Sequence, residues 1–297
     1  MGAGSKSRST RGGALPPGWS VLEEKGLWWF VTYRRLQRPD RSTVSWESRR
    51  LRKRRPRPSG STWWAPAALG WWIGVLFAAG SICFAVGAFP PYTDAVGAQV
   101  DGVTFFVGSL LFTSAALLLY CEVSWTPAPP SPGLLVRVRR CFVLQPRRID
   151  WVASLVQLAG TLFFNVSTGH AAFATLTGPT SANHAVWRPD AFGSICFLVS
   201  SWLSWAEVCH GPWQWRPRPI SWWIALLNLV GSVAFGASAV ASKVEPNGSL
   251  RSLALSNLGT FVGALCFLVG AVLLLPERTE GADPPVSTGL ELQSRAA

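Results

Sequence analysis

Six hydrophobic stretches of this chain each contain a glycine that is followed four residues later by phenylalanine. The six matches are GSICF at 80–84, GSLLF at 108–112, GTLFF at 160–164, GSICF at 193–197, GSVAF at 231–235 and GALCF at 263–267. A single match in an apolar segment carries no information, whereas six regularly placed matches indicate an internal repeat. The pattern therefore predicts a chain built from copies of one short unit.

Two further residue types divide the six matches into pairs. The glycines of the odd-numbered matches each follow a tryptophan by nine residues, and these tryptophans are Trp71, Trp151 and Trp222. The glycines of the even-numbered matches each precede a glutamate by fourteen residues, and these glutamates are Glu122, Glu207 and Glu277. The spacing predicts three copies of a two-helix unit, at residues 63–125, 149–210 and 220–278.

The apolar stretches are long enough to cross a membrane. A bilayer core about 30 Å thick needs roughly 20 apolar residues in a helix. Uncharged windows lie at 66–89, 102–121, 151–169, 220–241 and 252–275. The fourth stretch, between Asp190 and Glu207, has only sixteen uncharged residues, and it is assigned as a span from its place in the repeat.

These windows predict an all-α integral membrane protein with six transmembrane helices, arranged as three parallel two-helix repeats. A basic, partly disordered N-terminal cytoplasmic region (residues 1–62) precedes them, and a disordered tail (279–297) follows. The alternative, a soluble protein with buried helices, would require a polar face on each helix, and the first apolar window has none.

The positive charges predict the orientation in the membrane. Of the 27 Lys and Arg residues, 24 fall before residue 63, within 126–149, within 211–219 or after 276. The intervening loops hold the remaining three, Arg188, Lys243 and Arg251. Because cytoplasmic loops are enriched in Lys and Arg, we expect both termini to be cytoplasmic.

The N-terminal region has two recognisable parts. Runs at 26–34 and 42–47 are rich in β-forming residues and flank a turn-prone Arg-Pro-Asp, which predicts a small hairpin. A basic arm at 48–58 follows, immediately before the first span. Its cations are Arg49, Arg50, Arg52, Lys53, Arg54, Arg55 and Arg57. Each is expected to contribute about 1 kcal/mol of attraction to anionic headgroups, so we predict the lipid bilayer as the partner of the arm and regard nucleic acid as the less favoured alternative.

Few residues of the chain suit catalysis or metal binding. The histidines His170, His184 and His210 are scattered, and the six cysteines include no C-x-x-C pair. Gly-rich phosphate loops, G-x-S-x-G elbows and H-E-x-x-H motifs are absent from the sequence. We therefore predict no catalytic residues, no cofactor and no metal ligands.

Three amides fall inside the predicted spans: Gln157, Asn165 and Asn228. Gln157 and Asn228 occupy the same position, three residues before the glycine of their helices. Polar groups at this depth are unfavourable unless they are paired. They predict either hydrogen bonds that fix helix packing or the lining of a polar pathway, and we favour the former.

The glycine–phenylalanine pairs are expected to be packing residues. Residues four apart lie on one face of a helix, and a glycine beside a large ring allows two helices in lipid to approach closely. The twelve residues are Gly80, Phe84, Gly108, Phe112, Gly160, Phe164, Gly193, Phe197, Gly231, Phe235, Gly263 and Phe267.

The three repeated glutamates are expected at cytoplasmic helix C-termini, where the helix macrodipole disfavours an acid by about 0.3–1 kcal/mol. We hypothesise that Glu122, Glu207 and Glu277 form a cytoplasmic acidic ring. This ring would bind nearby arginines and so fix the repeats or dock the basic arm. The alternative is that each glutamate is simply solvated among the headgroups.

Each two-helix unit resembles the YrhK-like domain, a short bacterial module of two hydrophobic helices with G-S-x-x-F-type signatures. The resemblance covers 71–84 with 108–112, 151–164 with 193–197, and 222–235 with 263–267. It implies an integral membrane protein and transfers no catalytic residue. Arginine outnumbers lysine 23 to 4, which indicates a GC-rich bacterial genome.

Together these observations predict a multi-pass protein of a bacterial cell membrane with a structural or interaction role, whose basic arm binds lipid or a cytoplasmic partner. The alternative is a small-solute transporter or channel lined by the intramembrane amides. An enzyme is not expected.

Overall fold

Six long helices dominate the computed structural model, which describes residues 17–49, 63–126, 133–215, 217 and 219–277. The long helices are α2 (Leu69–Gly87), α4 (Ala98–Trp125), α6 (Ile149–Phe173), α8 (Arg188–Cys209), α9 (Ile220–Ala241) and α10 (Leu253–Glu277). The shorter ones are α3 (Pro90–Val96), α5 (Leu134–Cys141), α7 (Gly178–Ala182) and the π-helical turn η1 (Asn183–Trp187).

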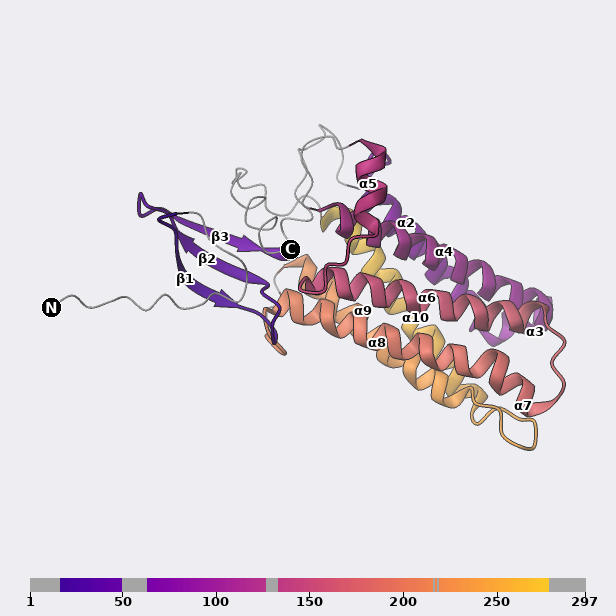
Figure 1. Cartoon of the computed structure of the whole chain (residues 1–297). Coiled ribbons are helices and arrows are strands. Elements are labelled where there is room, and N and C mark those ends of the chain that lie inside the picture. Colours follow the sequence, from indigo (N-terminus) through magenta and orange to yellow (C-terminus); the bar gives the residue numbers. More distant parts are fainter. Residues whose placement is uncertain (1–16, 50–62, 127–132, 216, 218, 278–297) are drawn as a thin grey trace.

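The six long helices form a closed ring. In the order α2, α4, α6, α8, α9, α10, each packs against the next, and α10 packs against α2. A three-stranded sheet lies beyond one end of this bundle, which we call the sheet end (Figure 1). Helices α3 and α7 lie at the opposite, far end.

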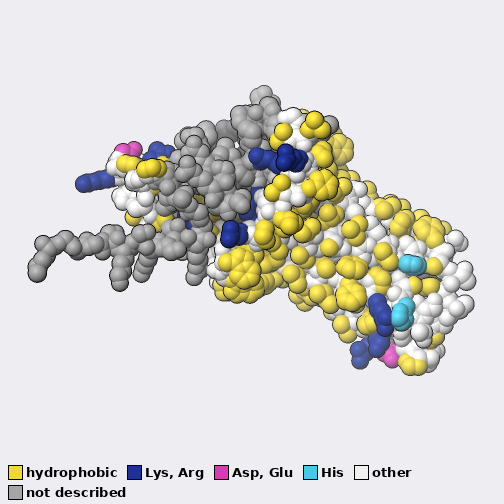
Figure 2. Space-filling view, viewed as in Figure 1, with side chains coloured by type: hydrophobic (Ala, Val, Ile, Leu, Met, Phe, Trp, Pro, Cys, Tyr) yellow, Lys and Arg dark blue, Asp and Glu magenta, His cyan; other side chains and the backbone are white. Residues whose placement is uncertain are grey.

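The outside of the bundle is apolar. All six long helices are long and apolar enough to cross a membrane, which indicates a multi-pass membrane protein. Side chains such as Ile82, Leu117 and Val233 are about half exposed on the outer surface. Figure 2 shows hydrophobic side chains over the bundle, with Lys and Arg gathered toward its two ends.

The fourth span is longer than its uncharged window predicts. A continuous helical run extends from Gly178 to Cys209 and has 32 residues. It includes the charged residues Arg188 and Asp190, which lie in the first turn of α8. The helix therefore begins well before the point where the uncharged window starts.

The N-terminal region forms an antiparallel sheet of three strands, β1 (Ser20–Lys25), β2 (Tyr33–Gln37) and β3 (Thr43–Glu47), in that spatial order. The hairpin of β2 and β3 agrees with the prediction of a turn near residues 38–40. Of the strand predicted over 26–34, only the end at Tyr33 and Arg34 is confirmed, as the start of β2. The rest was wrong, because the apolar residues Leu27 and Phe30 lie outside the sheet and pack against α6 and α8. The first strand, β1, was not predicted.

The first and third helix pairs begin with the same local structure. The indole N–H of Trp71 donates to the carbonyl oxygen of Trp63 at 3.0 Å, and that of Trp222 donates to the carbonyl of Gln214 at 3.1 Å. In both cases the acceptor lies eight residues before the tryptophan. A proline also stands five residues before each of the three repeated tryptophans, at Pro66, Pro146 and Pro217.

The glycines lie where two helices of one pair meet. A methyl group added to Gly193 would lie 2.9 Å from the Phe164 ring and 3.1 Å from the carbonyl oxygen of Gly160. One added to Gly231 would lie 3.1 Å from the carbonyl oxygen of Gly263. The pair α2 and α4 has the same arrangement, with Gly80 and Gly108 facing each other. In each pair the backbones are therefore in contact, and the phenylalanine of one helix covers the glycine of the other.

Candidate functional site

The six phenylalanines of the motif meet in the centre of the ring of helices. Those of the even-numbered matches form a mutually contacting triad, with ring centroids 6.4 Å apart for Phe112 and Phe197, 5.9 Å for Phe112 and Phe267, and 6.0 Å for Phe197 and Phe267. Each also contacts the phenylalanine of its partner helix, as Phe164 and Phe197 do at 4.9 Å. All six are buried. We call these six residues the phenylalanine layer.

A cavity lies between the phenylalanine layer and the sheet end of the bundle. Its volume is about 80 Å³, taken as the space open to the centres of water molecules. The triad of Phe112, Phe197 and Phe267 borders it on one side, and Arg49 and Glu207 border it on the other. The site is therefore positioned by the ring of helices and covered by the segment that follows the sheet.

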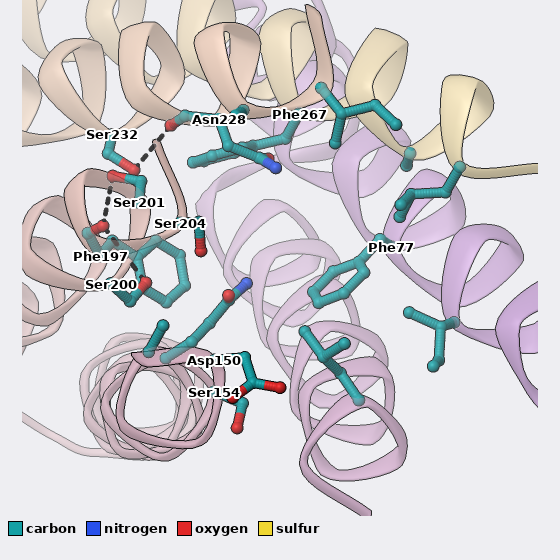
Figure 3. Close-up of a pocket in the computed structure, with 18 of the residues that line it drawn as sticks. Phe77, Asp150, Ser154, Phe197, Ser200, Ser201, Ser204, Asn228, Ser232 and Phe267 are labelled. Atoms are coloured by element: carbon teal, nitrogen blue, oxygen red, sulfur yellow. Dashed lines mark hydrogen bonds between the residues drawn. The ribbon is translucent and has the colours of Figure 1, made fainter. Parts of the chain in front are cut away.

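The wall of the cavity has a polar half and an apolar half. Helices α6, α8 and α9 supply the uncharged polar side chains Ser154, Gln157, Ser200, Ser201, Ser204, Asn228 and Ser232. Helices α2, α4 and α10 supply Ile73, Phe77, Leu119, Val123, Ala271 and Leu274. Figure 3 shows Phe77 facing the polar group from the opposite side of the cavity.

Most of the serine hydroxyls donate to carbonyls of their own helices. Ser201 donates to the carbonyl oxygen of Phe197 at 2.6 Å, and Ser232 to that of Asn228 at 2.8 Å (Figure 3). Ser154 donates to the carbonyl of Trp151 at 3.0 Å. These bonds occupy the hydroxyl protons and leave oxygen lone pairs available as acceptors.

The remaining polar side chains of the wall are unpaired within the described part of the chain. The amides of Gln157 and Asn228 and the hydroxyl of Ser204 have no hydrogen-bond partner among those residues. All three side chains are only partly buried in the bundle. These three groups are therefore available to whatever occupies the cavity.

The three amides predicted to lie in the spans are divided by the structure. Gln157 and Asn228 line the cavity. Asn165 does not: its side-chain oxygen accepts a hydrogen bond of 3.1 Å from the Thr113 hydroxyl, which joins α6 to α4. Gln157 and Asn228 thus border a cavity, whereas Asn165 joins two helices.

The sheet end of the cavity carries the charges. Arg49 donates through Nε to Glu277 at 2.7 Å, and the Ser48 hydroxyl donates to Glu207 at 2.7 Å. Asp150 is paired with Arg148 at 2.7 Å. The three repeated glutamates, Glu122, Glu207 and Glu277, are all buried.

The structure places the basic arm only in part. Arg49 lies inside the protein, with its side chain 15% exposed against Glu277. The other six cations of the arm, Arg50, Arg52, Lys53, Arg54, Arg55 and Arg57, lie outside the described residues.

Several cavity residues were missed by the sequence reasoning. These are Ser154, Ser200, Ser201, Ser204, Ser232 and Asp150. Comparing the three copies position by position would have pointed to two of them, because Ser154 stands where the other copies have Gly74 and Ala225, and Ser204 where they have Leu119 and Leu274.

The described part of the chain contains no cluster of three or more His, Cys, Asp or Glu side chains that could hold a metal ion. Comparisons with models of protein families, with curated proteins and with solved structures found no match. Functional inference therefore rests on the geometry of this chain.

Proposed function

We propose that this protein is a structural or interaction protein of a bacterial cell membrane, in which the six-helix bundle holds the N-terminal sheet and the basic arm at the cytoplasmic surface. The ion pair of Arg49 with Glu277 carries this proposal, because it joins the first cation of the arm to the last residue of α10. Both ends of the described chain lie at the sheet end (Figure 1), as an even number of spans requires.

The repeated glutamates fit the role of a docking ring. An acid at a helix C-terminus is disfavoured by the macrodipole by about 0.3–1 kcal/mol, and burial adds to this cost. Contacts with Ser48 and Arg49 offset it for Glu207 and Glu277. We propose that the acidic ring fixes the base of the arm and that the cations beyond it engage anionic headgroups.

The three helix pairs support the proposal of a triplicated unit. In each pair two glycines face each other and two phenylalanines enter the central layer. We propose that the pairs are copies with one orientation, arranged around an axis along the membrane normal. The resemblance to the YrhK-like domain stays a prediction.

A transporter or channel is the less favoured function. Transport along the bundle axis needs a route past the phenylalanine layer. The rings of that layer contact one another across the centre, at 5.7 Å for Phe84 and Phe235 and 6.0 Å for Phe164 and Phe235. The packed centre therefore favours a scaffold.

Limited proteolysis of the full chain in lipid nanodiscs tests the docking of the arm. Glu277→Gln removes the charge that Arg49 binds, so cleavage between residues 40 and 58 should become several-fold faster. The matched control is Asp94→Asn, which neutralises an exposed acid at the far end. Equal cleavage rates in the wild-type protein and Glu277→Gln would contradict the docking role.

The lipid partner is tested separately with the same nanodiscs. Adding anionic lipid should slow cleavage of the arm, and raising the salt concentration should reverse this protection because salt screens exposed charges. Protection that is equal in neutral and anionic nanodiscs would contradict a role for anionic headgroups.

A further inference from the structure

The cavity has features that a scaffold does not need. It lies in the middle of helices apolar enough to span a membrane, where polar groups are costly and usually mark functional positions. Yet Gln157, Ser204 and Asn228 all lack a hydrogen-bond partner within the described residues. Asn165, eight residues further along the same helix as Gln157, is paired with Thr113, so the bundle does supply a hydrogen-bond partner to another amide of α6.

The volume of the cavity defines the size of an occupant. A site needs at least about 10–15 Å³ of water-occupied space to hold one water molecule. The cavity volume of about 80 Å³ is several times this minimum, which sets an upper limit of roughly five to eight waters, or one solute of at most about that number of non-hydrogen atoms.

The hydrogen-bonding groups define its polarity. Ser154, Ser201 and Ser232 use their protons on helix carbonyls and present oxygen lone pairs, so they accept hydrogen bonds from an occupant. The amides of Gln157 and Asn228 both donate and accept. An occupant with several donors and at least one acceptor fits this wall.

The distribution of charge indicates a neutral occupant. The charged lining residues lie toward the sheet end, where Arg49 binds Glu277, Asp150 binds Arg148 and Glu207 accepts from Ser48. The side chains deeper in the cavity are uncharged. An ion placed there would lose its hydration without gaining a free counter-charge from these pairs.

The opposite wall indicates that one side of the occupant is hydrocarbon. Phe77 faces the polar half across the cavity (Figure 3), and Ile73 and Leu119 also line the cavity. A molecule that is polar all round would leave some of its groups unpaired against this wall. A short aliphatic chain with a carboxamide or hydroxyl group matches both halves.

We propose that this cavity is a binding site for one small neutral solute of at most about eight non-hydrogen atoms, with carboxamide or hydroxyl groups on one side and hydrocarbon on the other. Gln157 and Asn228 hold its polar groups, Ser204 adds a third contact, and the segment at Ser48 and Arg49 covers the site. The proposal does not depend on the scaffold role, since both walls of the cavity belong to the helices of the bundle and only the cover at Ser48 and Arg49 is shared with the arm.

Direct binding of radiolabelled butanamide to the purified full chain tests the proposal. Wild-type protein should bind it saturably, with about one molecule per chain. Butanoate has the same number of non-hydrogen atoms but carries a charge, and it should bind at least ten-fold more weakly. Gln157→Leu and Asn228→Leu should each lower the affinity for butanamide at least ten-fold.

Asn165→Leu is the matched control, because it removes an amide from the same helix as Gln157 without touching the cavity wall, and it should bind butanamide like the wild-type protein. If a leucine variant fails to fold, Ser204→Ala provides the smaller change and should weaken binding several-fold. The proposal is overturned if butanamide shows no saturable binding, which leaves water as the occupant. It is also overturned if butanoate binds equally well, or if the cavity variants bind like Asn165→Leu.

Discussion

The phenylalanine layer and the cavity beside it are built from the same six helices, yet they differ in symmetry. All six helices contribute a phenylalanine to the layer, and each phenylalanine covers a glycine of the partner helix. The cavity takes its uncharged polar groups from α6, α8 and α9. Positions that are the same in every copy thus make the contacts within each helix pair, at the glycines, and between pairs, at the phenylalanines. Positions at which the copies have diverged face the cavity, as Phe77, Gln157 and Asn228 do at one equivalent position.

The largest expected effect is at the glycines of the layer. Gly193→Leu places a side chain against the Phe164 ring and the backbone of Gly160, both about 3 Å from an added methyl group. Because a backbone cannot move aside as a side chain does, the loss of stability should exceed the roughly 1–3 kcal/mol of ordinary overpacking. Size-exclusion profiles and melting temperature in detergent measure this.

Gly133→Leu is the control, since among the described residues, its chain neighbours aside, no atom lies within 4 Å of the added carbon at that position. If both variants melt like the wild-type protein, the close contact of α6 with α8 is not what holds the layer together.

A smaller effect is expected from the rings themselves. Phe197 is 4% exposed and contacts three other rings of the layer. Phe197→Ala should therefore destabilise the bundle by about 3–5 kcal/mol, as other large-to-small core changes do. Phe192, on the same helix but 56% exposed, is the control, and Phe192→Ala should cost about 0.5 kcal/mol or less. Equal losses of stability would mean that the layer is no more important than the outer surface.

The layer could be predicted from the sequence, and the cavity could not. Glycine and phenylalanine four residues apart share a helix face, so their spacing alone places each ring beside a close helix contact. It does not say that α10 returns to α2 and closes the ring. The contact between Phe84 and Phe235 depends on that closure, so the spacing alone does not predict it.

The cavity depends on which faces of distant helices meet, and local spacing does not determine this. Serines such as Ser201 and Ser232 are common in membrane helices, where they bond to their own backbone, so their presence did not mark a site. The N-terminal region shows the same limit. Leu27 and Phe30 have the β-forming character of a strand, but the contact with α6 and α8 determines where they lie.

The smallest expected effect separates the two kinds of intramembrane amide. Asn165 accepts a hydrogen bond from Thr113, so Asn165→Leu should lower the stability by about 0.5–1.5 kcal/mol, the usual net contribution of such a bond. Gln157 has no partner within the described residues, so Gln157→Leu removes an unsatisfied polar group and should leave the melting temperature unchanged or raise it. Thermal unfolding of both variants in one detergent and without added solute makes the comparison. A loss of stability in Gln157→Leu as large as that in Asn165→Leu would assign both amides to helix packing. The polar wall of the cavity would then serve stability, as the phenylalanine layer does, and would no longer indicate a binding site.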